Sequence, residues 1–234
     1  MKVHRKLESF WQIAQSQGAL MALLYAADRL ARRVSAERVC IVPYVLLAQP
    51  VGGAVGRPLR DDAKTVVRAV AAGDEWAGQL PRPPEVNRAR WQAGAQCFAA
   101  AVGGELAATL WIQAQRHDEE EVRCRYVIAQ RGLAVWDFDL FLAPRFRFGR
   151  TFARLWTAVD AHLAAQGVRW TFSQISPFNE ASLRSHRQLG ALDVGRICFF
   201  VVGAFQLTVS SLSPRLHMGW RRDDRPEYQL RAPR

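Results

Sequence analysis

Apolar residues recur along this chain with two different periods, and the changes of period mark the predicted elements. Near the N-terminus, apolar residues return every three or four positions, which predicts one amphipathic helix over residues 7–35. The same period predicts three further helices, over residues 61–72, 151–166 and 180–189. Asn179 is the predicted cap of the last helix, and Gly190 is its predicted stop.

Alternating or continuous apolar runs, bounded by turn residues, predict the strands. These runs cover residues 39–51, 96–102, 105–114, 122–129, 135–143, 168–176 and 197–209. Gly103–Gly104 joins two of the strands in a predicted hairpin. Pro43 predicts an edge or a bulge in the first strand, since proline has no backbone N–H to donate. Residues 73–90 are predicted to be irregular, and residues 210–234 a polar tail.

The order of these elements indicates the fold class. A helix, a strand and a helix precede several antiparallel strands, and a strand–helix–strand–helix–strand series follows. This order predicts one mixed α/β (α+β) domain over residues 1–234 rather than a doubly wound parallel sheet. The sequence contains no internal repeat and no linker that would divide it.

The chain is basic, with a formal net charge of +11, and all but three of its 32 basic residues are arginine. Eight of these arginines fall between residues 144 and 196, against three acidic residues. General arginine abundance explains part of the charge, and the local excess favours a phosphorylated ligand. Nucleic acid is not expected as a partner, because no predicted helix carries a continuous basic stripe.

The cysteines and the N-terminus bear on the cellular compartment. Cys40, Cys97, Cys124 and Cys198 form no CxxC pair, so we expect reduced thiols, no metal site and a cytoplasmic protein. No apolar run reaches the ~18 residues of a membrane span. The N-terminal helix is expected to pack on the core. A basic amphipathic helix on a membrane surface stays open as the alternative, and so does a homodimer.

Residues 142–150 form the most informative segment. A predicted strand runs into a short basic loop, and the loop opens a helix, an arrangement that holds phosphate groups at helix N-termini. Arg147 and Arg150 would add charge-assisted hydrogen bonds. A solvated basic turn is the alternative. A second segment, Asn179–Gly190, follows about thirty residues later.

Together, these two segments resemble the GNAT acyltransferase family, whose members transfer an acyl group from acyl-coenzyme A. Leu142–Ala143–Pro144 is similar to the family's V-x-P strand end, and Arg147 stands three residues after the proline. Further matches are Leu155, Asn179, Ser182 and Gly190. His186 stands where the family has a tyrosine, and Phe148, Arg150 and Phe152 stand where it has glycines. The strong part of the resemblance covers about residues 105–200.

The resemblance implies a GNAT-like mixed, mostly antiparallel sheet flanked by helices, with an extra N-terminal helix, and acetyl-CoA or another acyl-CoA as cofactor. It places the pantetheine arm in a gap between two parallel strands. The implied cofactor contacts are Phe141, Leu142 and Ala143 for the pantetheine arm, Arg147, Phe148, Gly149, Arg150 and Thr151 for the pyrophosphate, and Asn179 and Ser182. Asn179 also suits a purely structural cap.

Three residues are candidates for proton transfer. His186 is the predicted acid for the leaving thiolate, with simple packing as the alternative. Asp137 and Asp139 lie two apart on one strand, and are predicted to share a face and to supply a general base, Asp139 ahead. Ion pairs with arginines such as Arg123 or Arg125 are the alternative. Residues 117–121 are predicted to be a solvated turn.

The expected function is transfer of an acetyl or other acyl group to an amine or hydroxyl of a small molecule, such as a sugar or cell-envelope precursor. A long-chain acyl or aminoacyl transferase working near a membrane through the N-terminal helix is the first alternative. A non-catalytic acyl-CoA-binding module is the second.

Overall fold

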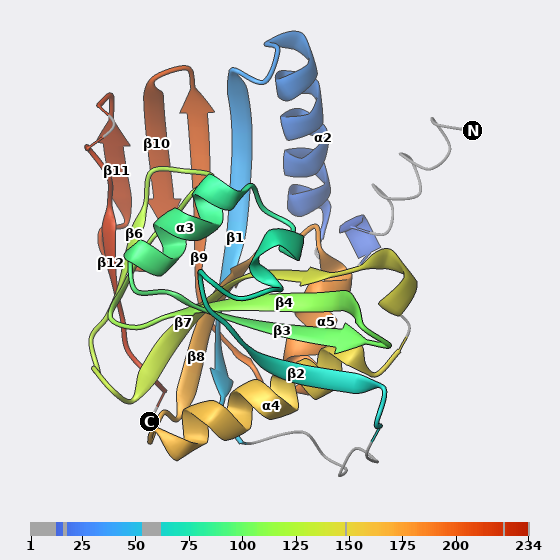
Figure 1. The fold of residues 1–234 in the computed structure, drawn as a ribbon. Coiled ribbons are helices and arrows are strands. Elements are labelled where there is room, and N and C mark those ends of the chain that lie inside the picture. Colours follow the sequence, from blue (N-terminus) through green and yellow to red (C-terminus); the bar gives the residue numbers. More distant parts are fainter. Residues whose placement is uncertain (1–12, 16–17, 53–61, 148, 222, 234) are drawn as a thin grey trace.

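The computed structural model describes residues 13–15, 18–52, 62–147, 149–221 and 223–233, and it is built around a nine-stranded sheet (Figure 1). The strand order is β11-β10-β9-β1-β8-β7-β4-β3-β2. The bounds are β1 Val39–Pro50, β2 Thr65–Val70, β3 Gln96–Val102, β4 Glu105–Gln113, β7 Ala134–Leu142, β8 Trp170–Ile175, β9 Leu192–Val202, β10 Phe205–Ser210 and β11 Leu216–Gly219. Of the neighbouring strands that the structure describes in this sheet, only β7 and β8 are parallel.

Helices and a second, three-stranded sheet cover the large one. The small sheet comprises β5 Arg116–Asp118, β6 Arg125–Ile128 and β12 Glu227–Leu230. The helices are α2 Ala19–Val34, α3 Pro84–Gln92, α4 Thr151–Ala165 and α5 Glu180–Gln188, with 3-10 turns at Ala77–Gln79 and Pro144–Phe146. The expected mixed, mostly antiparallel sheet is therefore confirmed.

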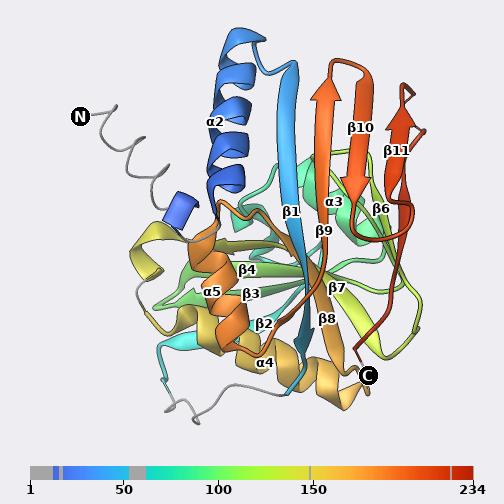
Figure 2. The same cartoon turned by 180° about the vertical axis from the view of Figure 1, so that it is seen from behind.

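The core has two main layers, one on each face of the sheet. On one face, Trp136 of β7 and Phe172 of β8 pack with Tyr126 and Tyr228 of the small sheet. On the other face, Val135 of β7 packs against the apolar side of α4. Figure 2 shows α4 and α5 together on this second face. We refer to the two faces as the α3 face and the α4 face.

The strands β7 and β8 separate after a short parallel pairing. Their register covers only Ala134–Trp136 against Trp170–Phe172. Beyond that point β7 stays paired with β4, but its register shifts between Thr109 and Trp111. Asp139 lies in this irregular part with a φ of +48°. A bulge bends the strand that contains it, and this one accompanies the divergence of β7 from β8.

The helix α2 protects the free edge of β1. The strand pairs with β8 only from Val45 onward, so its first half lacks a strand on that side. The Ile41 N–H donates to the Asp28 carboxylate at 2.8 Å, and the Val39 N–H donates to Ser35 Oγ at 2.8 Å. Pro43, the next residue along this edge, has no N–H. The predicted edge position of Pro43 is confirmed.

Two predicted elements are wrong. Residues 61–72, predicted as a helix, contain strand β2, whose Thr-Val-Val-Arg-Ala-Val sequence suits a sheet edge. Residues 73–90, predicted as irregular, contain the start of α3. Pro84 occupies the first turn of α3, where a missing N–H costs nothing.

The two ends of the chain also differ from the prediction. The expected helix over 7–35 is interrupted at Gly18, which has a φ of +91°, and α2 begins at the next residue. Residues 7–12 and 16–17 of that prediction lie outside the described residues. The expected polar tail contains strands β11 and β12, because β10 and β6 offer them open edges.

All four cysteines lie in the part of the chain that the structure describes. The four cysteines are free thiols, with Cys97 and Cys124 buried and Cys40 and Cys198 half-buried. No group of side chains among the described residues is arranged to hold a metal ion. Among the helices that the structure describes, none is long and apolar enough to cross a membrane.

The Asp28 carboxylate should contribute measurably to stability. Replacing it (Asp28→Ala) leaves the Ile41 N–H without its acceptor, so the free energy of unfolding should fall by about 1 to 3 kcal/mol in urea denaturation. The exposed neighbour Arg33→Ala is the control and should change it by less than about 0.5 kcal/mol. Equal stability of Asp28→Ala and wild type would contradict the edge-protecting role.

Candidate active site

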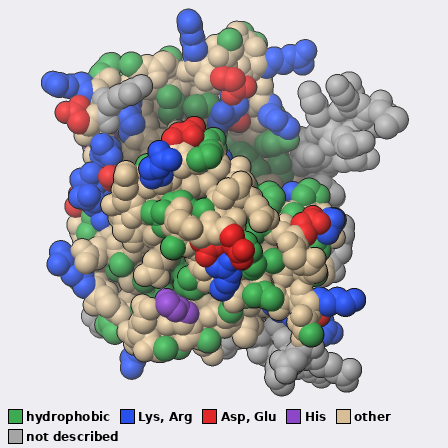
Figure 3. Space-filling view, viewed as in Figure 1, with side chains coloured by type: hydrophobic (Ala, Val, Ile, Leu, Met, Phe, Trp, Pro, Cys, Tyr) green, Lys and Arg blue, Asp and Glu red, His purple; other side chains and the backbone are tan. Residues whose placement is uncertain are grey.

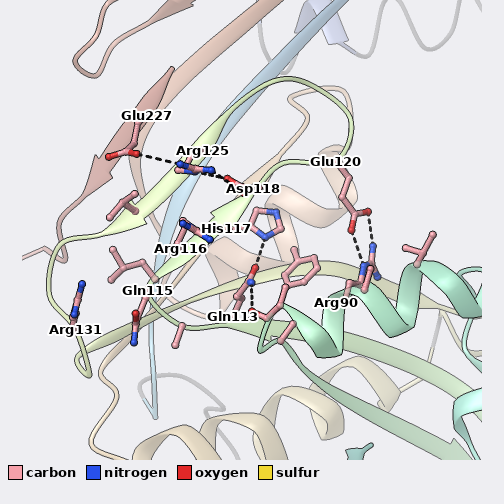
Figure 4. Close-up of a pocket in the computed structure, with 18 residues that line it drawn as sticks. Arg90, Gln113, Gln115, Arg116, His117, Asp118, Glu120, Arg125, Arg131 and Glu227 are labelled. Atoms are coloured by element: carbon pink, nitrogen blue, oxygen red, sulfur yellow. Dashed lines mark hydrogen bonds and ion pairs between the residues drawn. The ribbon is translucent and has the colours of Figure 1, made fainter. Parts of the chain in front are cut away.

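A cavity of about 520 Å³ lies on the α3 face, where β7 and β8 separate. It is bordered by side chains from α3, β7, β8, β1 and the segment between β5 and β6. A larger groove of about 970 Å³, shown in Figure 4, continues it between α3 and the small sheet. Arg90, His117, Glu120 and Phe138 line both spaces. The two spaces therefore adjoin and form one depression on the α3 face, which Figure 3 views in space-filling form.

Arg90 ties three walls of this depression together. Its side chain is only 5% exposed. It donates to both carboxylate oxygens of Glu120, at 2.8 and 2.7 Å, as Figure 4 shows. A third hydrogen bond runs to Asp139 at 2.6 Å, and the guanidinium lies over the rings of Trp111 and Phe138. The sequence patterns gave no indication of this residue.

Asp139 is held by two arginines. Besides Arg90, Arg82 donates to it at 2.9 and 2.6 Å. Partial burial acts to raise its pKa, but the hydrogen bonds from Arg82 and Arg90 keep the pKa below its ordinary value. A carboxylate occupied in this way is a weak proton acceptor. The geometry matches the ion-pair alternative, with Arg82 and Arg90 in place of Arg123 and Arg125.

Asp137 lies in different surroundings. The charged group that interacts with it is Asp160 of α4, on the α4 face of the sheet. The prediction that Asp137 and Asp139 share a face is wrong, because the irregularity at Asp139 breaks the alternation. Asp137 is 3% exposed, and its Oδ2 has no hydrogen-bond partner among the described residues. Burial, with the nearby Asp160 charge, raises its pKa to about 8. At neutral pH this group is a proton donor rather than a base.

Glu119 and His117 form a polar network that the sequence did not predict. The Gln174 amide donates to Glu119 Oε2 at 2.5 Å, and His117 Nε2 lies 3.5 Å from the same oxygen. Tyr126 donates to Gln174 at 2.7 Å, and His117 Nδ1 lies 3.1 Å from the Gln113 amide oxygen. His117 is buried, so the predicted solvated turn is wrong here. Arg116, His117 and Asp118 are all polar, so hydropathy alternation gave no signal for the burial of His117.

The loop before α4 contains the predicted phosphate-binding residues. Arg147 and Arg150 are exposed, and neither has an ion pair among the described residues. No side chain caps the N-terminus of α4, which begins at Thr151. Phe148 lies outside the described residues, and Gly149 does not need a left-handed conformation. An open helix N-terminus beside two arginines can bind an anion.

The backbone of β7 is only partly available for the predicted pantetheine contacts. The Ala143 N–H donates to the Ala107 carbonyl of β4 at 2.9 Å, and Phe141 lies opposite Thr109 in the same pairing. The Leu142 carbonyl accepts from Arg147 Nε at 3.4 Å. Of the three predicted residues, Leu142 is thus the one whose backbone contacts the basic loop.

His186 is buried on the α4 face and packs edge-on against Trp156 and Phe152. Its Nδ1 lies 2.9 Å from the amide oxygen of Gln49. Burial lowers its pKa to about 4, so the imidazole is neutral at physiological pH. A neutral ring that gives its N–H to Gln49 has no proton for a thiolate. These surroundings favour the packing alternative over the predicted acid role.

Asn179 caps α5 as predicted. Its Oδ1 accepts a hydrogen bond from the Ser182 N–H at 3.2 Å. Asn179 is exposed and Ser182 half-buried, at the same end of the α4 face as the loop before α4. Capping accounts for this pair, and its cofactor contact stays a prediction.

The comparisons with known proteins concern the fold. No family model matches the chain, and no curated protein matches it by sequence. Solved structures do match. An acetyltransferase of the GNAT family from Novosphingobium aromaticivorans shares 19% identity at a TM-score of 0.47, over 69% of this chain and 64% of that one. A functionally unknown conserved protein from Staphylococcus epidermidis shares 10% at 0.51, over 75% and 67%.

A GCN5-related N-acetyltransferase from Kribbella flavida shares 16% identity at a TM-score of 0.42, over 74% of this chain and 64% of that one. The chain thus spans about two thirds of the length of these proteins. At such identities the likeness is one of fold. The expected mixed, mostly antiparallel sheet is the one found, and its parallel pair, β7 and β8, diverges and is joined by α4.

The buried carboxyl of Asp137 should make stability fall with rising pH. The folded state keeps this proton up to about pH 8, whereas an unfolded chain releases it near the ordinary value of 3.8. The folded state therefore binds more protons between these values, and the free energy of unfolding decreases as pH rises. Asp137→Asn removes this effect. The free energy of unfolding of the variant minus that of wild type should therefore be larger at pH 8 than at pH 5, by about 1 kcal/mol or more.

Urea denaturation at several pH values measures this difference. The exposed Asp223→Asn is the control and should follow the wild-type pH dependence. Parallel curves for Asp137→Asn and wild type would show that Asp137 is ionised in the folded state.

Proposed function

We propose that this chain transfers an acyl group from acyl-CoA to the amine of a small, positively charged acceptor. The observation that carries the proposal is the divergence of β7 and β8. On one side of it lies the open N-terminus of α4, flanked by arginines, and on the other side lies the acidic cavity. An amino sugar is one acceptor of this class. Acyl-CoA supplies the activated thioester.

The residues around the loop before α4 fit the phosphate groups of coenzyme A. Arg147 and Arg150 are exposed, and α4 presents uncapped N–H groups beside them. These groups would hold the pyrophosphate through charge-assisted hydrogen bonds. The strands beyond Trp136 and Phe172 have no mutual pairing, so their facing backbone groups suit the amides of the pantetheine arm.

The cavity on the α3 face fits a cationic amine. Besides the protonated Asp137, four acidic residues line it against two arginines, in a chain of net charge +11. Asp139 and Glu120 are neutralised by arginines. Among the described residues, the Glu119 carboxylate is held instead by Gln174, His117 and the backbone N–H of Glu121. Glu119 is thus the carboxylate best placed to attract an ammonium group and to take its proton, directly or through water.

Asp137 would supply the proton for the departing sulfur. It borders the cavity where the strands separate, and it holds a proton at neutral pH. The Oδ2 atom has no other partner among the described residues. In this proposal the base, Glu119, and the acid, Asp137, stand on opposite sides of the divergence.

A long-chain acyl donor is the second candidate, and one observation favours it. An apolar cavity of about 310 Å³ between α2 and the sheet shares Tyr44 with the acidic cavity. The apolar walls of this cavity suit an acyl chain. Thiol release with donors of increasing chain length separates this candidate from an acetyl-specific enzyme.

Loss of the loop arginines should weaken coenzyme A binding. For Arg147→Ala/Arg150→Ala, the Kd measured by calorimetry should rise about tenfold or more, since two charge-assisted contacts are lost. Arg88→Ala/Arg169→Ala removes the same charge from exposed positions elsewhere and should leave the Kd within about twofold. An unchanged Kd in the loop variant would refute the phosphate site.

Removal of the Glu119 charge should slow transfer. Glu119→Gln should lower kcat for thiol release by about a hundredfold, as expected for loss of a general base. The Kd for coenzyme A should not change. The exposed Glu75→Gln is the control. A kcat within twofold of wild type across a panel of amines would exclude Glu119 as the base.

A further inference from the structure

One face of the upper half of the large sheet is apolar, and no helix or strand that the structure describes covers it. Residues opposite each other in the register lie on the same face, and one such row is Ile41, Phe200, Leu207 and Met218. In Figure 2, no helix of the described residues lies in front of this part of β9, β10 and β11. We call these four residues, with the neighbouring row, the apolar sheet face.

The neighbouring row has the same character. It consists of Pro43, Cys198, Val209 and Leu216. The outer members of both rows, Val209, Leu216 and Met218, are between 44% and 59% exposed. The opposite side of these strands packs into the core through Phe199 and Ile197. Neighbouring exposed apolar side chains of this kind are typical of binding surfaces.

A second apolar surface runs along α2. Leu20, Leu23, Leu30 and Val34 are between 60% and 79% exposed, and with the exposed Ala27 they follow a regular spacing of three and four. The expectation that this stripe packs on the core is therefore wrong. The helix α2 instead attaches through its opposite side, where Ala22 and Asp28 are buried.

An apolar cavity of about 310 Å³ lies between α2 and the apolar sheet face, with Met21 and Leu24 of α2 on one wall. Pro43, Cys198 and Val209 of the apolar sheet face form the other wall. Leu24 is the chain neighbour of Leu23 in the stripe, so the stripe and the sheet face flank one apolar cavity.

The charges around this surface indicate what covers it. The exposed side of α2 carries Arg29 and Arg33 and no acidic residue, because Asp28 is buried. Arg38 and Arg215 are exposed at the ends of β1 and β11. A two-fold second copy would bring basic rims against each other, at an electrostatic cost. An anionic lipid surface would neutralise them.

We propose that the α2 stripe and the apolar sheet face together lie on an anionic phospholipid membrane. Amphipathic helices bind in this way by burying apolar side chains at the headgroup boundary while arginines meet the phosphates. Trp220, exposed at the end of β11, suits that boundary. The surface is distinct from the acidic cavity, and the inference does not depend on acyl transfer.

Sedimentation of the full chain with vesicles tests the proposal. The chain should pellet with vesicles of phosphatidylcholine containing about a third phosphatidylglycerol, and at least tenfold less with pure phosphatidylcholine. Leu23→Glu/Leu30→Glu and, separately, Met218→Glu should each reduce binding at least tenfold. Arg29→Ala/Arg33→Ala should remove most of the preference for anionic vesicles.

The matched control is Val66→Glu, which puts the same charge on a similarly exposed valine of β2. It should bind as wild type does, and circular dichroism should show every variant folded. Failure of the wild type to bind, or equal loss in the control, would overturn the proposal. So would a wild-type dimer that ignores vesicles and becomes monomeric in Leu23→Glu/Leu30→Glu, since the second copy would then be the occupant.

Discussion

The buried ion pair between Arg90 and Asp139 is the interaction on which the acidic cavity depends. Asp139 lies in the irregular part of β7 with a left-handed φ, and Arg90 reaches it from α3 while also holding Glu120 of the segment between β5 and β6. Two charges at this depth are costly unless each is fully paired, and Arg82 completes the set. The same strand distortion that separates β7 from β8 thus supplies the carboxylate that fixes the opposite wall. The cavity and the divergence of the strands have one structural origin.

The distortion also gives two neighbouring acidic residues opposite protonation states. Asp139 is ionised because arginines surround it, whereas Asp137 keeps its proton because it is buried without a cation. Two residues of one strand thereby differ in their chemistry by environment alone. Glu119 is held by an amide and an imidazole rather than by an arginine. The acid role proposed for Asp137 follows from its buried environment.

Local patterns in the sequence were sufficient to predict part of this structure. The strand, basic loop and helix around Arg147 were predictable because each depends on residues within one short segment, and so was the cap at Asn179. The relation of Asp137 to Asp139 was not predictable, since a single irregular residue reverses the alternation of a strand. The burial of His117 and the clamp at Arg90 arise from contacts between distant segments. Periodicity likewise identified the apolar stripe of α2, but periodicity says only that a face is apolar and not what covers it.

The edge of β1 has a consequence for how this molecule can associate. An open strand edge normally offers a ladder of free N–H groups to any other extended chain. Along the first half of β1, Asp28 and Ser35 occupy two of those donors, and Pro43 lacks the third. Beside this edge lies an apolar surface of the kind that often begins β-sheet aggregation. With these donors already occupied, another extended chain cannot pair with this edge of β1, so adhesion beside it proceeds through side chains and not through the backbone of β1.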